Sequence, residues 1–115
     1  MGKTMSGQGK VVWLTTKGRR TGRPRSTAIG FADEPDGSVL VAANDDSTAW
    51  ARNLLVEPNC RVDIGGRHFR AMAEPLEGPD HNRAIAALIL RYGTPAEKLG
   101  HGPSFRLRPV PDEPL

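Results

Sequence analysis

The sequence is poor in residues that build covalent or metal-bound scaffolds. Cys60 is the only cysteine in 115 residues, so no internal disulfide can form and thiolates cannot build a zinc cluster. The three histidines, His68, His81 and His101, have no cysteine or carboxylate partner at metal-ligand spacing. We therefore expect no metal site. We also expect Cys60 to be inert, because no histidine lies beside it to activate the thiol.

Long apolar runs and aromatic side chains are also scarce. No stretch approaches the ~18 apolar residues of a membrane-spanning helix, and the first ten residues, MGKTMSGQGK, are too polar for a secretory signal. We therefore expect a cytoplasmic protein without a transmembrane segment. The aromatic residues are two Trp, one Tyr and three Phe, and none follows Trp13 in the basic stretch described next. Nucleic acid is not the expected partner, because base stacking needs such side chains.

Positive charge is concentrated in one short stretch. Of the 16 Lys and Arg residues, five lie between positions 17 and 25 with no acidic residue among them, and elsewhere 11 bases face 13 acids. Gly18 and Gly22 can turn backbone amides toward a ligand, and neighbouring threonines add hydroxyl donors. An arginine fork can bind two phosphate oxygens at once, so this basic loop predicts an anion site, with a solvated turn as the alternative. Its cations are Lys17, Arg19, Arg20, Arg23 and Arg25.

Hydrophobic periodicity predicts a mainly β protein with two helices. Strands are expected at residues 11–16, 25–31, 39–43, 60–65, 67–76 and 104–108. Helices are expected at 49–56, capped by Ser47 or Thr48, and from 79 to 92, with His81 exposed on the first turn. Hairpins dominate this order, which favours an antiparallel barrel or a mixed α+β sheet. We expect one domain at residues 10–110 between tails at 1–9 and 111–115.

Three segments carry a family resemblance. Residues 14–25 read LTTKGRRTGRPR, residues 49–59 read AWARNLLVEPN, and residues 64–78 read IGGRHFRAMAEPLEG. In the same order they resemble the LTTxGRKTGxPR, PxWxxNLxANP and VGGRxFxAxAxxLEG motifs of the deazaflavin-dependent nitroreductase family. Members of that family are small split β-barrel oxidoreductases, similar to FMN-binding proteins, that use the 8-hydroxy-5-deazaflavin coenzyme F420.

The resemblance implies a fold, a reaction and a cofactor site. It implies a split β-barrel that transfers a hydride from the reduced deazaflavin to an electron-poor acceptor such as a quinone, an enone or a nitro compound. The catalytic residues are unknown, and Asn44 and Tyr92 are candidates for the acceptor pocket. The residues that the resemblance assigns to the cofactor are Thr15, Thr16, Lys17, Arg19, Arg20, Thr21, Pro24, Arg25, Ala43, Asn44, Trp50 and Asn53.

Two departures from the family pattern leave alternatives open. Residues 44–46 read Asn-Asp-Asp where the well-studied branch has Ser-Lys, so FMN remains an alternative cofactor. Only Tyr92 matches that branch's three pocket tyrosines, since Pro95 and Lys98 occupy the other two places. The alternatives are an FMN-binding split-barrel protein and a non-catalytic module that binds an anionic or hydrophobic ligand. The expected partner is a small-molecule acceptor, and the chain is expected to be a monomer or a homodimer.

Overall fold

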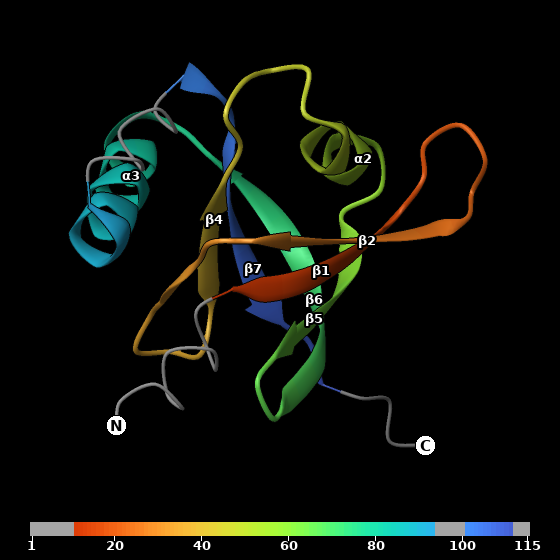
Figure 1. Cartoon of the computed structure of the whole chain (residues 1–115), viewed down its shortest axis with the longest axis horizontal. Helices are drawn as coiled ribbons and strands as arrows, with labels where there is room; N and C mark the ends of the chain where they lie inside the picture. Colours follow the sequence, from red (N-terminus) through yellow and green to blue (C-terminus); the bar gives the residue numbers. More distant parts are fainter. Residues whose placement is uncertain (1–10, 94–100, 112–115) are drawn as a thin grey trace.

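Antiparallel strands are the main secondary structure of the protein. The computed structural model describes residues 11–93 and 101–111. Seven strands form one sheet in the order β2-β1-β5-β6-β7-β4-β3, and Figure 1 shows this sheet curling, with α2 and α3 beside it. The strands are β1 (Val12–Lys17), β2 (Pro24–Ile29), β3 (Ala32–Asp33), β4 (Val39–Ala42), β5 (Asn59–Ile64), β6 (Arg67–Leu76) and β7 (Ser104–Pro109). The helices are α2 (Ala49–Val56) and α3 (Gly78–Tyr92).

The predicted strands and helices are confirmed, with small shifts at their ends and one addition. Strand β3 was not predicted, because its two residues are too few to show a periodicity. It forms where the chain turns back and pairs Ala32 with Leu40 and Asp33 with Val39. The prediction of about six antiparallel strands is confirmed, with β3 as a seventh strand. The bounds predicted for the domain stay a prediction, since residues 1–10, 94–100 and 112–115 lie outside the described part.

The inner face of the curled sheet carries the larger of two core clusters. Alternation in β1 buries Val12 and Leu14 completely and leaves Trp13 54% exposed on the opposite face. Helix α2 adds Trp50 to this cluster, with its ring centroid 5.9 Å from that of Phe105. Burying such apolar surface contributes about 25 cal/mol per Å². This contact holds α2 against the barrel and so fixes the orientation of the helix face that meets β1.

The second core cluster lies between the sheet and α3. Strand β4 is buried on both faces, as its apolar sequence predicts: Val39 and Val41 join the barrel core, whereas Leu40 and Ala42 face α3. On α3, Leu88 is fully buried in this cluster.

None of the helices within residues 11–93 and 101–111 has the length and apolar content needed to cross a lipid bilayer.

Two predicted side-chain environments are wrong. The side chain of the N-cap residue of α2, Thr48, makes no capping bond; instead, Asp45 Oδ1 accepts hydrogen bonds from Ser47 N at 2.9 Å and from Ser47 Oγ at 2.8 Å. These bonds hold the pKa of Asp45 below its usual value. His81 is only half-exposed, because its Nδ1 lies 2.6 Å from Oγ of the buried Ser104.

The loop that leads into α2 packs tightly against the segment before β7. Ala43 N donates a hydrogen bond to Pro103 O at 2.9 Å. At Gly102, an added Cβ would lie 2.5 Å from Ala43 O and 2.7 Å from Asp45 N. Both atoms belong to the backbone and cannot rotate away. Only glycine therefore allows this approach, which holds the loop in front of α2.

We predict that Gly102→Ala destabilises the protein by about 1–3 kcal/mol, because the methyl group overpacks against the backbone. Urea unfolding followed by circular dichroism measures this loss. Gly66→Ala is the matched control, since a Cβ there meets nothing within 4 Å. Equal unfolding free energies for the two variants would contradict the close approach.

Candidate functional site

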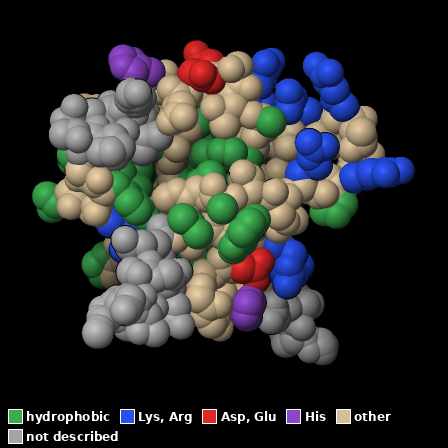
Figure 2. All heavy atoms as spheres, in the orientation of Figure 1, with side chains coloured by type: hydrophobic (Ala, Val, Ile, Leu, Met, Phe, Trp, Pro, Cys, Tyr) green, Lys and Arg blue, Asp and Glu red, His purple; other side chains and the backbone are tan. Residues whose placement is uncertain are grey.

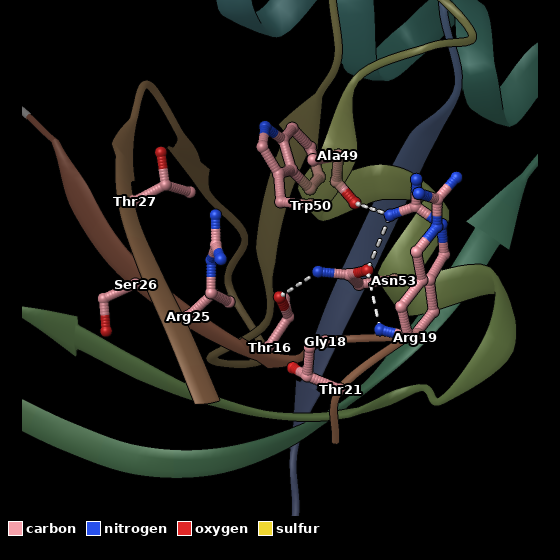
Figure 3. Close-up of a pocket in the computed structure, with 11 residues that line it drawn as sticks. Thr16, Gly18, Arg19, Thr21, Arg25, Ser26, Thr27, Ala49, Trp50 and Asn53 are labelled. Carbon is pink, nitrogen blue, oxygen red and sulfur yellow. Dashed lines mark hydrogen bonds between the residues drawn. The ribbon is translucent and has the colours of Figure 1, made fainter. Parts of the chain in front are cut away.

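A cavity of about 620 Å³ lies where the basic loop meets α2 (Figure 3), and we refer to it as the basic cavity. Three parts of the chain form it: the end of β1 with its following loop, strand β2, and the start of α2. Its lining residues are Thr16, Gly18, Arg19, Arg20, Thr21, Arg25, Ser26, Thr27, Ala49, Trp50 and Asn53.

The β1–β2 hairpin brings cations and hydroxyl groups to one wall of the basic cavity. The register places Arg25 opposite Thr16 and Thr27 opposite Leu14, so Arg25 and Thr27 lie on the same face of the sheet as buried Thr16. Figure 3 shows Arg25 and Thr27 together on the β2 side. The loop closes through hydrogen bonds of 2.8 Å from Gly18 N to Arg23 O and from Gly22 N to Gly18 O.

Asn53 joins α2 to strand β1 and to the basic loop. Its side chain is buried, with the residue only 4% exposed. Its Nδ2 donates to Thr16 Oγ1 at 3.1 Å, and its Oδ1 accepts from Arg19 N at 3.2 Å and from Arg19 Nη1 at 2.9 Å (Figure 3). Arg19 Nη1 also lies 3.5 Å from Ala49 O. Strand β1, the basic loop and α2 are therefore linked through one amide.

No acidic side chain among the described residues compensates the positive charge at the basic cavity. None of Arg19, Arg20 and Arg25 forms an ion pair with another described residue, and no Asp or Glu lines the cavity. Figure 2 shows Lys and Arg side chains gathered at the end of the molecule where this loop lies. A concave surface with charge of one sign attracts a ligand of the opposite sign. The cavity is therefore suited to an anion.

Most residues that the family resemblance assigns to the cofactor meet at this cavity. Two of the assigned residues, Thr15 and Lys17, do not line the basic cavity, because they lie on the face of β1 opposite to Thr16. Together with Pro24 they line a second cavity of about 360 Å³. The pKa of Glu57 in that cavity is lowered mainly by hydrogen bonds from Asn59 and also by the charge of Lys17. The assigned residues that line the basic cavity are Thr16, Arg19, Arg20, Thr21, Arg25, Trp50 and Asn53.

The remaining assigned residues lie outside the lining of both cavities. Ala43 is buried against Pro103, and Asn44 is exposed in the loop before α2. The hydroxyl of Tyr92 accepts a hydrogen bond from Phe31 N at 3.0 Å and donates one to Phe31 O at 3.2 Å. Tyr92 thus ties α3 to the connection between β2 and β3.

Three lining residues were not predicted from the sequence: Ser26, Thr27 and Ala49. The sequence could have predicted Thr27 as a lining residue, because it stands two residues after Arg25 in a predicted strand and so lies on the same face. Ala49 had a weaker signal as the neighbour of Trp50. Its contribution is a backbone carbonyl, which no side-chain pattern reveals.

Among the described residues, neither the thiol of Cys60 nor a cluster of metal-ligating side chains lies at the basic cavity. Burial raises the pKa of Cys60 to about 12, so the thiol stays protonated at neutral pH, and it donates to Ala71 O at 3.6 Å. Residues 11–93 and 101–111 contain no group of three or more His, Cys, Asp or Glu side chains placed to hold a metal ion. The described part of the site instead offers cations, hydroxyl groups and an indole ring.

Known proteins similar in sequence to this chain agree with one another. A sequence model of the family described as F420H(2)-dependent quinone reductase matches residues 1–96. The F420H(2)-dependent quinone reductase Rv1261c of Mycobacterium tuberculosis (strain ATCC 25618 / H37Rv) is 26% identical over 114 residues, which cover 96% of this chain and 76% of that protein.

Solved structures confirm the expected split β-barrel. An F420-H2 dependent reductase (FDR-A) superposes with a TM-score of 0.73 at 21% identity, covering 86% of this chain and 94% of that one. HutZ, the heme storage protein of Vibrio cholerae, superposes with a TM-score of 0.72 at 23% identity, covering 95% and 87%. The two differ in the ligands their names indicate. The shared fold alone therefore does not choose the ligand.

We predict that Tyr92→Phe lowers the free energy of unfolding by about 1–2 kcal/mol, because two hydrogen bonds to the Phe31 backbone are lost. Urea unfolding measures the change. Leu90→Ala on the same helix is the control, since Leu90 is 86% exposed and its truncation should leave stability nearly unchanged. A Tyr92→Phe variant as stable as the wild type would exclude this structural role.

Proposed function

The chain belongs to the F420H(2)-dependent quinone reductase family, and on that premise we propose that its basic cavity binds the deazaflavin coenzyme F420 for the reduction of a quinone. The observation that supports this site most strongly is the set of three arginines, Arg19, Arg20 and Arg25, that face the cavity without an acidic partner among the described residues. Such a set is suited to a ligand that carries several negative charges.

The residues present fit the groups that the coenzyme carries. Its phosphate and acidic tail need cations and hydrogen-bond donors, which Arg19, Arg20 and Thr21 supply from the loop and Arg25 supplies from β2. Its ring system needs a flat apolar wall, which Trp50 supplies. A volume of about 620 Å³ also lies within the range of about 300–1,000 Å³ usual for small-molecule sites.

The protein's own part in the reaction is binding, orientation and charge stabilisation. When bound, the reduced coenzyme supplies a hydride from C5 of its deazaflavin ring. Arg19 and Arg20 would hold the anionic end of the coenzyme, and Trp50 would help to orient its ring system. Arg25 would hold the same anionic end from β2, and the combined positive charge of the three arginines would stabilise the negative charge that develops on the quinone oxygen. No described His, Asp or Glu lines the cavity to donate the proton that completes the hydroquinone.

A titration with two cofactors tests the proposal. Trp50 lines the cavity, whereas Trp13 lies on the outer face, so a Trp13→Phe variant leaves Trp50 as the only tryptophan reporter. We expect oxidised F420 to quench Trp50 fluorescence at a lower concentration than FMN. We also expect the reduced coenzyme to be oxidised when a soluble quinone is added, with an enone and a nitro compound as comparison acceptors. Absence of F420 binding would refute the proposed function.

We predict that Arg25→Ala weakens F420 binding by about 10- to 150-fold, the equivalent of one charge-assisted hydrogen bond. Fluorescence titration measures the Kd, and circular dichroism checks the fold. Arg23→Ala removes the same charge from the same hairpin, but the exposed Arg23 side chain does not line the basic cavity, so its Kd should stay close to the wild-type value. Equal losses in the two variants would indicate a general charge effect rather than a defined contact.

A further inference from the structure

Asn53 is a buried polar residue on an otherwise apolar helix face. The other buried residues of α2 are Trp50, Ala51 and Leu54. Burying an amide is costly unless its donors and acceptors are paired. Both acceptor positions of Asn53 Oδ1 are used by Arg19, and Nδ2 is bound to Thr16, which is itself only 2% exposed. With its carbonyl oxygen saturated, Asn53 is placed to organise the cavity rather than to offer an acceptor to a ligand.

The groups that hold the Arg19 guanidinium carry no net charge. They are the amide oxygen of Asn53, 2.9 Å from Nη1, and the backbone carbonyl of Ala49, 3.5 Å from it. A carboxylate in their place would form an ion pair and cancel the positive charge. Neutral acceptors fix the position of the guanidinium and leave its charge intact. Arginine has five N–H donors, so others remain for an anion.

We infer that Asn53 is a positioning residue that orients Arg19 toward the anionic part of the coenzyme while preserving the charge of the guanidinium. Asn53 has this role only if the basic cavity holds the coenzyme as proposed above. Orienting Arg19 before binding lowers the conformational entropy that binding would otherwise cost. Because Asn53 also binds the backbone N–H of Arg19, the position of the loop and that of the side chain are set together.

The isosteric variant Asn53→Asp separates the effect of the position of Arg19 from the effect of its charge. It keeps an oxygen facing Arg19, and the Thr16 hydroxyl can rotate to donate to the other carboxylate oxygen, so we expect the fold to be retained. The added negative charge pairs with Arg19. We expect the Kd for oxidised F420 to rise about tenfold or more. We expect kcat at saturating coenzyme to change much less than KM, because Asn53 does not touch the reacting atoms.

A double-mutant cycle tests whether Asn53 acts through Arg19. In an Arg19→Ala background, Asn53→Asp should raise the Kd by a clearly smaller factor than in the wild type, since the ion pair with Arg19 is gone and only direct repulsion of the anionic coenzyme remains. In an Arg23→Ala background it should have its full effect, because Arg23 is on the same loop but outside the cavity lining. Equal effects in the two backgrounds, or an Asn53→Asp variant that binds F420 as tightly as the wild type, would overturn the inference.

Two controls distinguish failure of the inference from misfolding of the variant and from failure of the proposed function. If Asn53→Asp does not unfold cooperatively, Thr16→Val replaces it, because it removes the anchor of Nδ2 without adding charge. We expect Thr16→Val to weaken F420 binding in the wild-type background and not in the Arg19→Ala background, and equal weakening in both would overturn the inference. A wild-type protein that binds no F420 would refute the proposed function, whereas a wild type that binds F420 unaffected by these variants would refute only the role of Asn53.

Discussion

The site depends on the three hydrogen bonds of one buried amide. Asn53 joins α2 to Thr16 at the end of β1 and to Arg19 in the following loop. The amide is buried there because Trp50 and Leu54 on the same helix face pack into the barrel core. Apolar packing therefore sets the position of the helix, and the amide converts that position into a defined placement of the basic loop. A loop rich in glycine and arginine would otherwise have to be ordered by its ligand alone.

Arginines serve two opposite electrostatic purposes in this protein. Arg106 donates to Glu34 at 2.7 Å and to Glu74 at 3.3 Å, and its hydrogen bond to Glu34 is the main cause of its raised pKa. This network compensates the charge and joins β6 and β7 to the turn after β3. Arg19 and Arg25 have no such acidic partner among the described residues. Compensated arginines contribute to structure, whereas uncompensated ones around a cavity are available to a ligand.

The split β-barrel supports more than one ligand chemistry, as its likeness to both an F420-dependent reductase and a heme storage protein indicates. The curled sheet provides an apolar core and an end at which α2 and the β1–β2 loop meet. The ligand is then selected by the side chains at that end. In this chain they are arginines, threonines and an indole, which agrees with the family that the sequence itself matches.

Periodicity and contiguous motifs in the sequence predict six of the seven strands, both helices, the basic loop and the place of Trp50 and Asn53 on one helix face. That Thr16 lines the basic cavity, whereas its neighbour Lys17 lines only the second cavity, follows from tertiary contacts and not from the motif that contains both. Only the tertiary structure decided that Ala49 O faces Arg19, 30 residues away in sequence. Local alternation establishes that adjacent strand residues point to opposite faces. Which face meets the helix depends on how the sheet curls and on contacts between distant parts of the chain.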